Sequence, residues 1–146
     1  MERKPKNIFV NGAITPQFIA TSIAKHQSQT GIGAHQIFLG QVRADAINQQ
    51  VVQAITYTAN EVMALEEMHT IREAIFQEFH LTCLHVYHSL GTVKAGEICL
   101  FVFVSAKHRK AAIQACEVLV EAIKTKLPVW GKEIFENETY QWKENN

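Results

Sequence analysis

The sequence predicts an α+β sandwich built as one domain. Segments with the three- to four-residue hydrophobic spacing of helices alternate with segments of strand character, and most of the strands lie close enough in the chain to form hairpins. Helices interleaved with such strands are typical of a sheet that carries helices on its faces. A chain of 146 residues, 47% of them hydrophobic, can bury one sizeable core. We therefore expect residues 1–146 to form a single domain with a polar tail at 1–6.

Ten elements are expected, in the order β-α-β-β-α-β-β-α-β-β. Strands are predicted at 7–14, 34–43, 51–59, 81–90, 97–105, 132–135 and 139–142, and helices at 16–29, 61–79 and 107–126. The strands at 34–43 and 51–59 are expected to pair as a hairpin across a polar connection. Residues 98–104 are apolar throughout, which is typical of a strand covered on both faces. The last two strands are expected to form a C-terminal hairpin over residues 130–143.

Each helix has a start signal. Thr15 followed by Pro16 predicts an N-cap with proline at the first helical position. Asn60 is expected to cap the second helix and Ser105 the third, which Pro128 ends. The expected core stripes are Val62, Leu65, Met68 (or His69), Ile71, Ile75 and Phe79 in the second helix and Ile113, Cys116, Leu119, Val120 and Ile123 in the third.

Charge and motifs exclude several classes of function. Fourteen basic residues balance fourteen acidic ones, so no overall field attracts nucleic acid or an anionic membrane. The sequence has no P-loop, GxGxxG, GxSxG or HExxH motif. No signal-peptide pattern follows the polar start, and no apolar stretch reaches the roughly 18 residues that would cross a bilayer. We expect a cytoplasmic protein.

Cysteine and histidine spacing predicts no metal site. The three cysteines, Cys83, Cys99 and Cys116, lie far apart without CxxC spacing, so neither a disulfide framework nor a zinc site is indicated. Buried structural thiols are the main expectation, and a reactive thiol is the alternative. His85 and His88 are three positions apart in one expected strand, so they face opposite sides and cannot share a metal ion.

The candidate functional residues are cations at the ends of elements. They are Arg43, the Lys107–Lys110 run, Lys124, Lys126 and Lys132. Cations in the first turn of a helix are repelled by its dipole, and a bound anion offsets that repulsion. Arg109 and His108 therefore indicate a phosphate or carboxylate site, although a solvated face would explain them equally well. His108 and Lys124 are sixteen residues apart, about 24 Å along a helix, so one pocket could use both only across a homodimer.

Five segments resemble the large, catalytic subunit family of molybdopterin synthase. Residues 38–43 (F-L-G-Q-V-R) resemble its F-x-G-x-V-R strand, 104–109 (V-S-A-K-H-R) its S-x-H-R helix opening, and 124–133 (K-T-K-L-P-V-W-G-K-E) its K-x-x-x-P-x-W-K-K-E segment. Residues 88–91 and 95–97 are similar to its H-R-x-G and x-G-E turn. The segments occur in the family's order over about residues 7–142, and together they are specific.

The resemblance implies a fold, partners and a reaction. The implied fold is an α/β hammerhead sandwich with an additional small antiparallel β subdomain, and the implied assembly is a homodimer within a heterotetramer. Each large subunit would bind a small ubiquitin-like sulfur-carrier subunit. Sulfur would pass from the carrier's C-terminal thiocarboxylate to cyclic pyranopterin monophosphate, giving molybdopterin. The carrier supplies the sulfur, so no cofactor, metal or catalytic cysteine is expected.

The resemblance also implies roles for individual residues. Lys124 and Lys132 would be catalytic, with Lys124 at the carrier tail. The substrate would be held by Gln41, Val42, Arg43, His108, Arg109, Gly131, Lys132 and Glu133, with His108 and Arg109 contributed by the partner subunit.

One departure concerns Gly131, which stands where the family has the first of two consecutive lysines. Lys132 could supply this amine through a one-residue shift, Lys126 could compensate, or activity could be reduced. Gln41 also replaces a common lysine. The alternatives are therefore a weak or inactive scaffold that binds the sulfur carrier, or an unrelated anion-binding α+β module.

Overall fold

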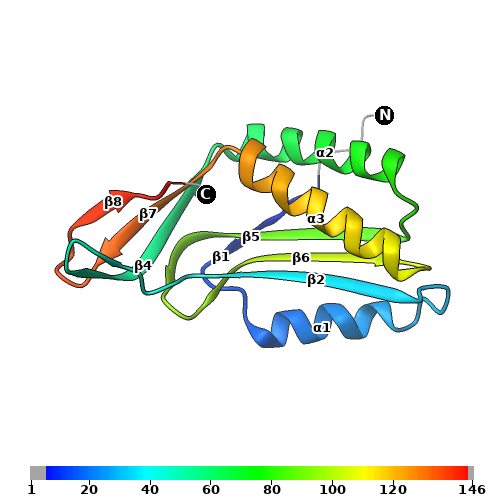
Figure 1. Cartoon of the computed structure of the whole chain (residues 1–146), viewed down its shortest axis with the longest axis horizontal. Coiled ribbons are helices and arrows are strands. Elements are labelled where there is room, and N and C mark those ends of the chain that lie inside the picture. Colours follow the sequence, from blue (N-terminus) through cyan, green and yellow to red (C-terminus); the bar gives the residue numbers. More distant parts are fainter. Residues whose placement is uncertain (1–5, 145–146) are drawn as a thin grey trace.

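An eight-stranded sheet with helices on both faces forms the body of the protein, as a computed structural model describes it for residues 6–144 (Figure 1). The strands are β1 (Phe9–Asn11), β2 (Ala34–Gln41), β3 (Ala46–Ile47), β4 (Gln50–Ala59), β5 (Cys83–Lys94), β6 (Ile98–Ala106), β7 (Val129–Phe135) and β8 (Tyr140–Trp142). The helices are α1 (Pro16–His26), α2 (Glu61–Glu78) and α3 (Arg109–Lys126). Helices α2 and α3 cover one face and α1 the other, while β4, β7 and β8 extend beyond the helices. The predicted fold class, a sandwich with a small antiparallel extension, is confirmed.

Strand β5 joins the two parts of the sheet, whose strand order is β2-β6-β5-β4-β7-β8. Its first half pairs antiparallel with β6, from Cys83 opposite Ser105 to His88 opposite Leu100. Its second half pairs antiparallel with β4, from Gly91 opposite Tyr57 to Lys94 opposite Ala54. Strand β1 runs parallel to the middle of β5. The small β layer, made of β4, β7 and β8, therefore shares strand β5 with the main sheet.

The core lies mainly between the sheet and helices α2 and α3. Buried Met68, Ile71 and Ile75 of α2 meet Leu119 and Ile123 of α3 in one cluster. A smaller cluster under α1 contains Ile14, Phe101 and Phe103. Residues 99–106 of β6 are all buried, so the prediction of a strand covered on both faces is confirmed.

Two of the three predicted helix caps are confirmed. The Thr15 hydroxyl accepts a hydrogen bond from the Phe18 N–H at 3.1 Å, and the Asn60 side-chain oxygen accepts one from the Met63 N–H at 3.2 Å. The prediction for Ser105 is wrong. Strand β6 continues to Ala106 because it pairs with β2 up to that residue. Helix α3 therefore starts at Arg109. The N-cap residue is His108, whose side chain makes no capping hydrogen bond.

The predicted hairpin between residues 34–43 and 51–59 is also wrong. Strand β2 lies at the edge of the sheet and pairs with β6, whereas β4 pairs with β5 and β7. The local hairpin is shorter, because Asn48 and Gln49 adopt φ values of 51° and 67° and make a tight turn between β3 and β4. The C-terminal hairpin predicted for residues 130–143 is confirmed as β7 and β8.

The predicted helix stripes contain one wrong residue each. Val62 is 70% exposed and Ile113 is 50% exposed. In α3 the buried face instead includes Ala112 and Ala115, whose small side chains allow the helix to approach the sheet closely.

The first five residues of the predicted tail lie outside the described residues. Within residues 6–144, no helix has the length and apolar character needed to cross a membrane.

Gly33 is required by a close backbone contact before β2. A Cβ atom at position 33 would overlap the carbonyl oxygen of Lys107, whereas a Cβ at Gly31 meets nothing within 4 Å. We expect Gly33→Ala to lower the free energy of unfolding by roughly 1–3 kcal/mol, because backbone must move to accept the methyl group. Urea denaturation measures this, with Gly31→Ala as the matched control, expected to change stability by less than about 0.5 kcal/mol. Equal effects of the two substitutions would contradict the packing described here.

Candidate active site

A pocket forms where the C-terminal end of α3 meets the small β layer. Its lining residues come from β4, β5, α3, β7 and the segment after β8, and they are Tyr57, His88, Ile123, Lys124, Leu127, Val129, Gly131 and Lys143. Leu127 has extended backbone at the C-cap, and Pro128 accepts a hydrogen bond from the Asn60 N–H at 3.1 Å. These features end the helix and turn the chain into β7, which brings Lys124 and Gly131 to the same pocket.

Lys124 has a lowered pKa in this pocket. Burial is the main cause, because it disfavours the ammonium form. The positive charge of Lys143 lowers the pKa further, and Cys99 acts in the opposite direction. A lowered pKa increases the fraction of neutral amine near neutral pH, so Lys124 can serve as a proton donor and acceptor or as a nucleophile.

His88 and Tyr57 form the uncharged wall of the pocket. Burial lowers the pKa of His88 to about 4, and Lys124 and Lys143 add repulsion against the imidazolium. The His88 Nδ1–H donates a hydrogen bond to the carbonyl of Ser89 at 2.8 Å, which leaves the lone pair on Nε2. Burial also raises the pKa of Tyr57, whose ring lies edge-on to His88 at 5.1 Å. Among the lining residues, the charge therefore comes from Lys124 and Lys143.

Gly131 is explained by the close approach of β4. A Cβ atom at position 131 would lie 3.0 Å from Cγ2 of Ile55 and 3.2 Å from Cε1 of Tyr57. The Tyr57 ring therefore occupies the space beside residue 131. A lysine at this position would require the ring to move.

Lys143 is the functional candidate that the sequence analysis missed. Its N–H donates a hydrogen bond to the Gly131 carbonyl at 2.8 Å, and its side chain lines the same pocket as Lys124. Lys143 therefore brings an amine to the neighbourhood of Gly131 from the segment after β8. The register of the final hairpin, with Lys132 opposite Trp142, was the signal that could have identified it.

Lys132 lies on the other face of β7. Its Nζ sits 4.4 Å from the centre of the Tyr140 ring and 6.0 Å from that of Trp142, which is cation–π geometry. The pairing of β7 with β4 is regular from Gly131 to Glu133, so the side chain of Lys132 lies on the opposite face of β7 from residue 131. A catalytic role for Lys132 stays a prediction.

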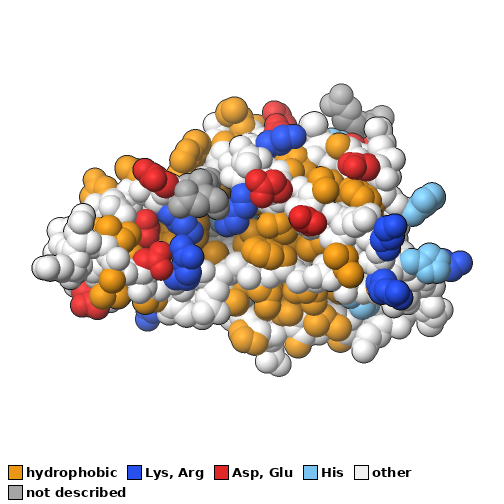
Figure 2. Space-filling model, viewed as in Figure 1, with side chains coloured by type: hydrophobic (Ala, Val, Ile, Leu, Met, Phe, Trp, Pro, Cys, Tyr) orange, Lys and Arg blue, Asp and Glu red, His pale blue; other side chains and the backbone are white. Residues whose placement is uncertain are grey.

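A wider hollow of about 320 Å³ lies beside the pocket and shares Lys143 with it. Its other polar lining residues are Arg43, Asp45, Glu133, Gln141 and Glu144. Arg43 is paired with Asp45 at 3.2 Å, and the buried Glu133 accepts a hydrogen bond from Gln141 at 3.3 Å. Figure 2 shows Lys and Arg side chains gathered where the small β layer meets the main body.

Gln41 and Val42 lie at the end of β2. Gln41 is exposed. Val42 is buried, its N–H donates to the Glu97 carbonyl at 3.0 Å, and its carbonyl accepts from the Gly96 N–H at 2.8 Å. Val42 therefore holds the turn between β5 and β6 in place. Contact of these two residues with substrate stays a prediction.

His108 and Arg109 are exposed at the opposite end of α3. His108 lines a separate hollow of about 380 Å³ with Lys107 and His80. Figure 2 shows this second group of basic and histidine side chains at the far end of the molecule from the first. A single chain thus keeps His108 and Arg109 away from Lys124, as the length of the helix requires. That a homodimer brings His108 and Arg109 of one copy close to Lys124 of the other stays a prediction.

Comparison with known proteins identifies the family. The model of the MoaE protein family matches residues 14–126. This chain belongs to the MoaE protein family. The matched region contains His108, Arg109 and Lys124 but ends before Gly131 and Lys143, so the amine that comes from the C-terminal hairpin lies outside it.

Related sequences carry the name molybdopterin synthase catalytic subunit. One from Pyrococcus abyssi is 36% identical over 107 residues, which cover 73% of this chain and 72% of the relative. One from Drosophila willistoni is 37% identical over 117 residues, covering 79% of this chain but 31% of the relative. The MoaE chain described here thus spans about a third of the length of the fly relative that it matches.

Solved structures have the same fold. Molybdopterin synthase from Staphylococcus aureus matches with a TM-score of 0.79 and 26% identity, covering 93% of this chain and 95% of that one. A complex of subunits 1 and 2 of the molybdopterin-converting factor from Helicobacter pylori matches with a TM-score of 0.79 at 20% identity, covering 94% and 90%. The second likeness concerns the fold alone.

We expect the charge of Lys143 to lower the pKa of His88 by a measurable amount. Lys143→Gln removes a positive charge that disfavours the imidazolium, so the pKa of His88 should rise from about 4. NMR titration of the His88 ring measures the change. Lys126→Gln, at an exposed position at the end of α3, is the control and should leave the pKa of His88 unchanged. A His88 pKa that responds equally to both substitutions, or to neither, would contradict the placement of Lys143.

Proposed function

We propose that this chain is the catalytic subunit of a molybdopterin synthase. It would transfer sulfur from the C-terminal thiocarboxylate of a small carrier protein to cyclic pyranopterin monophosphate. The observation that carries the proposal is the pair of lysines, Lys124 and Lys143, that line one pocket beside a hollow containing Arg43. Family membership and the printed names of the relatives support it.

The sizes of the two spaces suit different parts of the substrates. The Lys124 pocket is narrow, about 30 Å³, which is room for about two water molecules. The family resemblance implies a carrier tail that ends in Gly-Gly, which has no side chain to place there. The adjacent hollow of about 320 Å³ falls in the size range of small-molecule sites, and Arg43, which is paired with Asp45, is among its lining residues. We therefore assign the pocket to the reacting acyl end and the hollow to the pterin.

The chemistry requires two changes of bonding for each sulfur. The thiocarboxylate sulfur bonds to a carbon of the pterin side chain, which gives a thioester between carrier and substrate. A carbon–oxygen bond at that carbon breaks, and the oxygen either takes up a proton and leaves as water or stays on the phosphate. Water then attacks the acyl carbon, the acyl carbon–sulfur bond breaks, and the carrier leaves as a carboxylate while sulfur stays on the pterin. Two such transfers give the dithiolene.

The two lysines would serve the charged species in this sequence. An ammonium group at Lys124 stabilises the thiocarboxylate and the oxyanion formed when water attacks. The neutral amine, favoured by the lowered pKa, can accept a proton from that water. Lys143 adds a second positive charge and helps to keep the pKa of Lys124 low. The carrier brings the sulfur, so this scheme uses no bound cofactor, and buried Cys99 and Cys116 take no part.

The remaining cations would act in an assembly. In a homodimer within a heterotetramer, each carrier would dock at one Lys124 pocket, and His108 and Arg109 of the second copy would bind the substrate phosphate. These two residues stand at the start of α3, where the helix dipole also favours an anion. The compartment in which this would occur is the cytoplasm.

A scaffold without activity is the second candidate, and Gly131 is the observation that favours it. Carrier binding alone does not separate the two functions, because both require it. The separating experiment mixes the purified chain with thiocarboxylated carrier and cyclic pyranopterin monophosphate and measures molybdopterin formed. Product formation supports the synthase, whereas carrier binding without product supports the scaffold.

Substitution of single lysines tests which amine acts. We expect Lys124→Ala to lower the rate by about a hundredfold or more, because it removes a charge that stabilises the reacting group. Lys143→Ala should lower it by about tenfold through the loss of the second charge. Lys25→Ala, in α1 on the other face of the sheet, is the control and should retain the rate.

Lys132→Ala compares the two possible second amines. A larger loss of rate with Lys132→Ala than with Lys143→Ala would assign the second amine to Lys132 and contradict the role given to Lys143. Normal rates for both Lys124→Ala and Lys143→Ala would refute the mechanism. Circular dichroism and a melting curve for each variant confirm that the fold is retained.

A further inference from the structure

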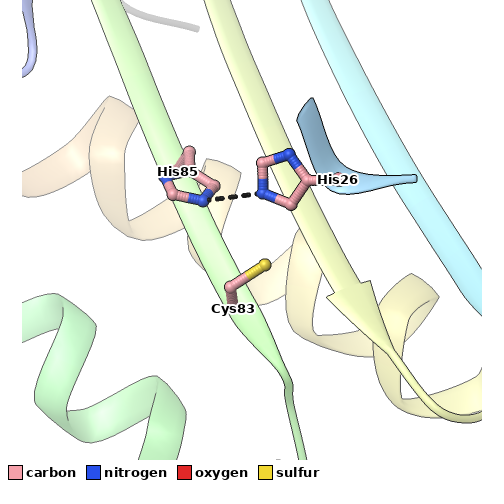
Figure 3. A group of neighbouring side chains, drawn as sticks. All are labelled: His26, Cys83 and His85. Atoms are coloured by element: carbon pink, nitrogen blue, oxygen red, sulfur yellow. Dashed lines mark hydrogen bonds between the residues drawn. The ribbon is translucent and has the colours of Figure 1, made fainter. Parts of the chain in front are cut away.

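A cluster of three metal-binding side chains lies on the α1 face of the sheet, away from the Lys124 pocket. Cys83 and His85 are two positions apart in β5 and therefore point to the same face, opposite to His88. His26, in the last turn of α1, meets them there (Figure 3). The Cys83 sulfur and one ring nitrogen from each histidine all lie within 4.8 Å of one another. This group is not apparent from the sequence, because His26 and Cys83 are 57 positions apart.

Hydrogen bonds aim the histidine rings at each other. The His26 Nδ1–H donates to the Ser22 carbonyl at 2.7 Å, since a carbonyl can only accept. The lone pair of His26 therefore sits on Nε2, which is 3.0 Å from Nε2 of His85. Metal-binding histidines usually make this kind of second bond, because it fixes the tautomer and the orientation of the ring. His26 thus has the geometry of a ligand supported by its own helix.

We propose that His26, Cys83 and His85 bind one zinc ion, with water as the fourth ligand. Zinc prefers tetrahedral sites built from imidazole nitrogen and thiolate sulfur. Ideal bond lengths place two coordinating nitrogens about 3.3 Å apart and a nitrogen and sulfur about 3.6 Å apart. The nitrogens are at 3.0 Å and the whole group is within 4.8 Å, so small side-chain rotations suffice. None of the three is a carboxylate, which disfavours magnesium and calcium.

Zinc binding at this site would displace one proton and move another. The thiol of Cys83 loses its proton to solvent. In the hydrogen-bonded pair, His85 donates from Nε2 to His26 and its Nδ1 accepts from Lys6 at 3.0 Å. Coordination through Nε2 moves the His85 proton to Nδ1, so the exposed Lys6 side chain turns away.

The neighbouring cations limit the affinity. Lys6 and Arg72 line the same hollow as His85, and their positive charges oppose a divalent ion there. The role that fits this position is structural, because the ion would join the end of α1 to β5. Binding to the native state alone would then raise the stability of the fold with increasing zinc concentration.

Cobalt substitution tests the ligand set directly. After treatment with a chelator, the full chain is titrated with Co²⁺, and absorbance is followed for the thiolate-to-cobalt charge-transfer band. We expect one equivalent to bind with this band and the bands of tetrahedral cobalt, and Zn²⁺ to displace it. Wild-type protein without a thiolate band, or without stoichiometric binding, would overturn the proposal whether or not any variant folds.

Variants locate the site. Cys83→Ser and His26→Gln should weaken Zn²⁺ binding by about a hundredfold or more, measured by competition with a chromophoric chelator. The matched controls are Cys116→Ala, a buried thiol in α3, and His80→Gln, an exposed histidine, and both should bind as wild type. Lys6→Ala should bind more tightly, because it removes both a competing hydrogen bond and a charge. Zinc affinity that is unchanged in Cys83→Ser and His26→Gln would show that any bound zinc lies elsewhere and would refute the site.

Discussion

The change of partner along β5 determines where the other parts of the candidate site lie. The strand pairs with β6 up to His88 and with β4 from Gly91, which has a φ of 81° that L side chains rarely adopt. This glycine allows the strand to turn out of the main sheet and carry the small β layer past the end of α3. Tyr57 lies directly opposite Gly91, so the same turn sets the Tyr57 ring against His88. Without it, Lys124 would end its helix facing solvent instead of a walled pocket.

That wall determines the chemistry of the lysines. Neutral His88 and Tyr57 line the pocket beside Lys124, and burial disfavours the ammonium form of Lys124 and lowers its pKa. Two ammonium groups in such a pocket repel each other, and an entering anion relieves that repulsion. We therefore expect the pocket to favour a negatively charged reacting group. The lowered pKa of Lys124 also favours proton exchange, which the proposed hydrolytic step would use.

Local signals predicted the elements, while contacts distant in sequence determined the site. The Thr15 and Asn60 caps, the buried run of β6 and the last hairpin were predictable because each depends on neighbouring residues. The pairing of β2 with β6 was not, because an apparent hairpin with β4 was closer along the chain. Lys143 was missed for a related reason: its importance follows from the strand register, not from any motif. The charge pattern supplied Lys124 and the family resemblance supplied its role, but neither could supply a residue outside the motifs.

The Gly131 departure is best understood from the ring that faces it. Tyr57 and a side chain at residue 131 compete for one space, since a Cβ there would lie 3.2 Å from the ring. Glycine at 131 leaves the Tyr57 ring in place, and the second amine of the pocket comes from Lys143 in the segment after β8. The Lys143 backbone is hydrogen-bonded to Gly131, and its side chain lines the pocket. The number of amines in the pocket depends on the fold as well as on the motif. The missing lysine at position 131 is therefore weaker evidence for an inactive scaffold than the sequence alone suggests.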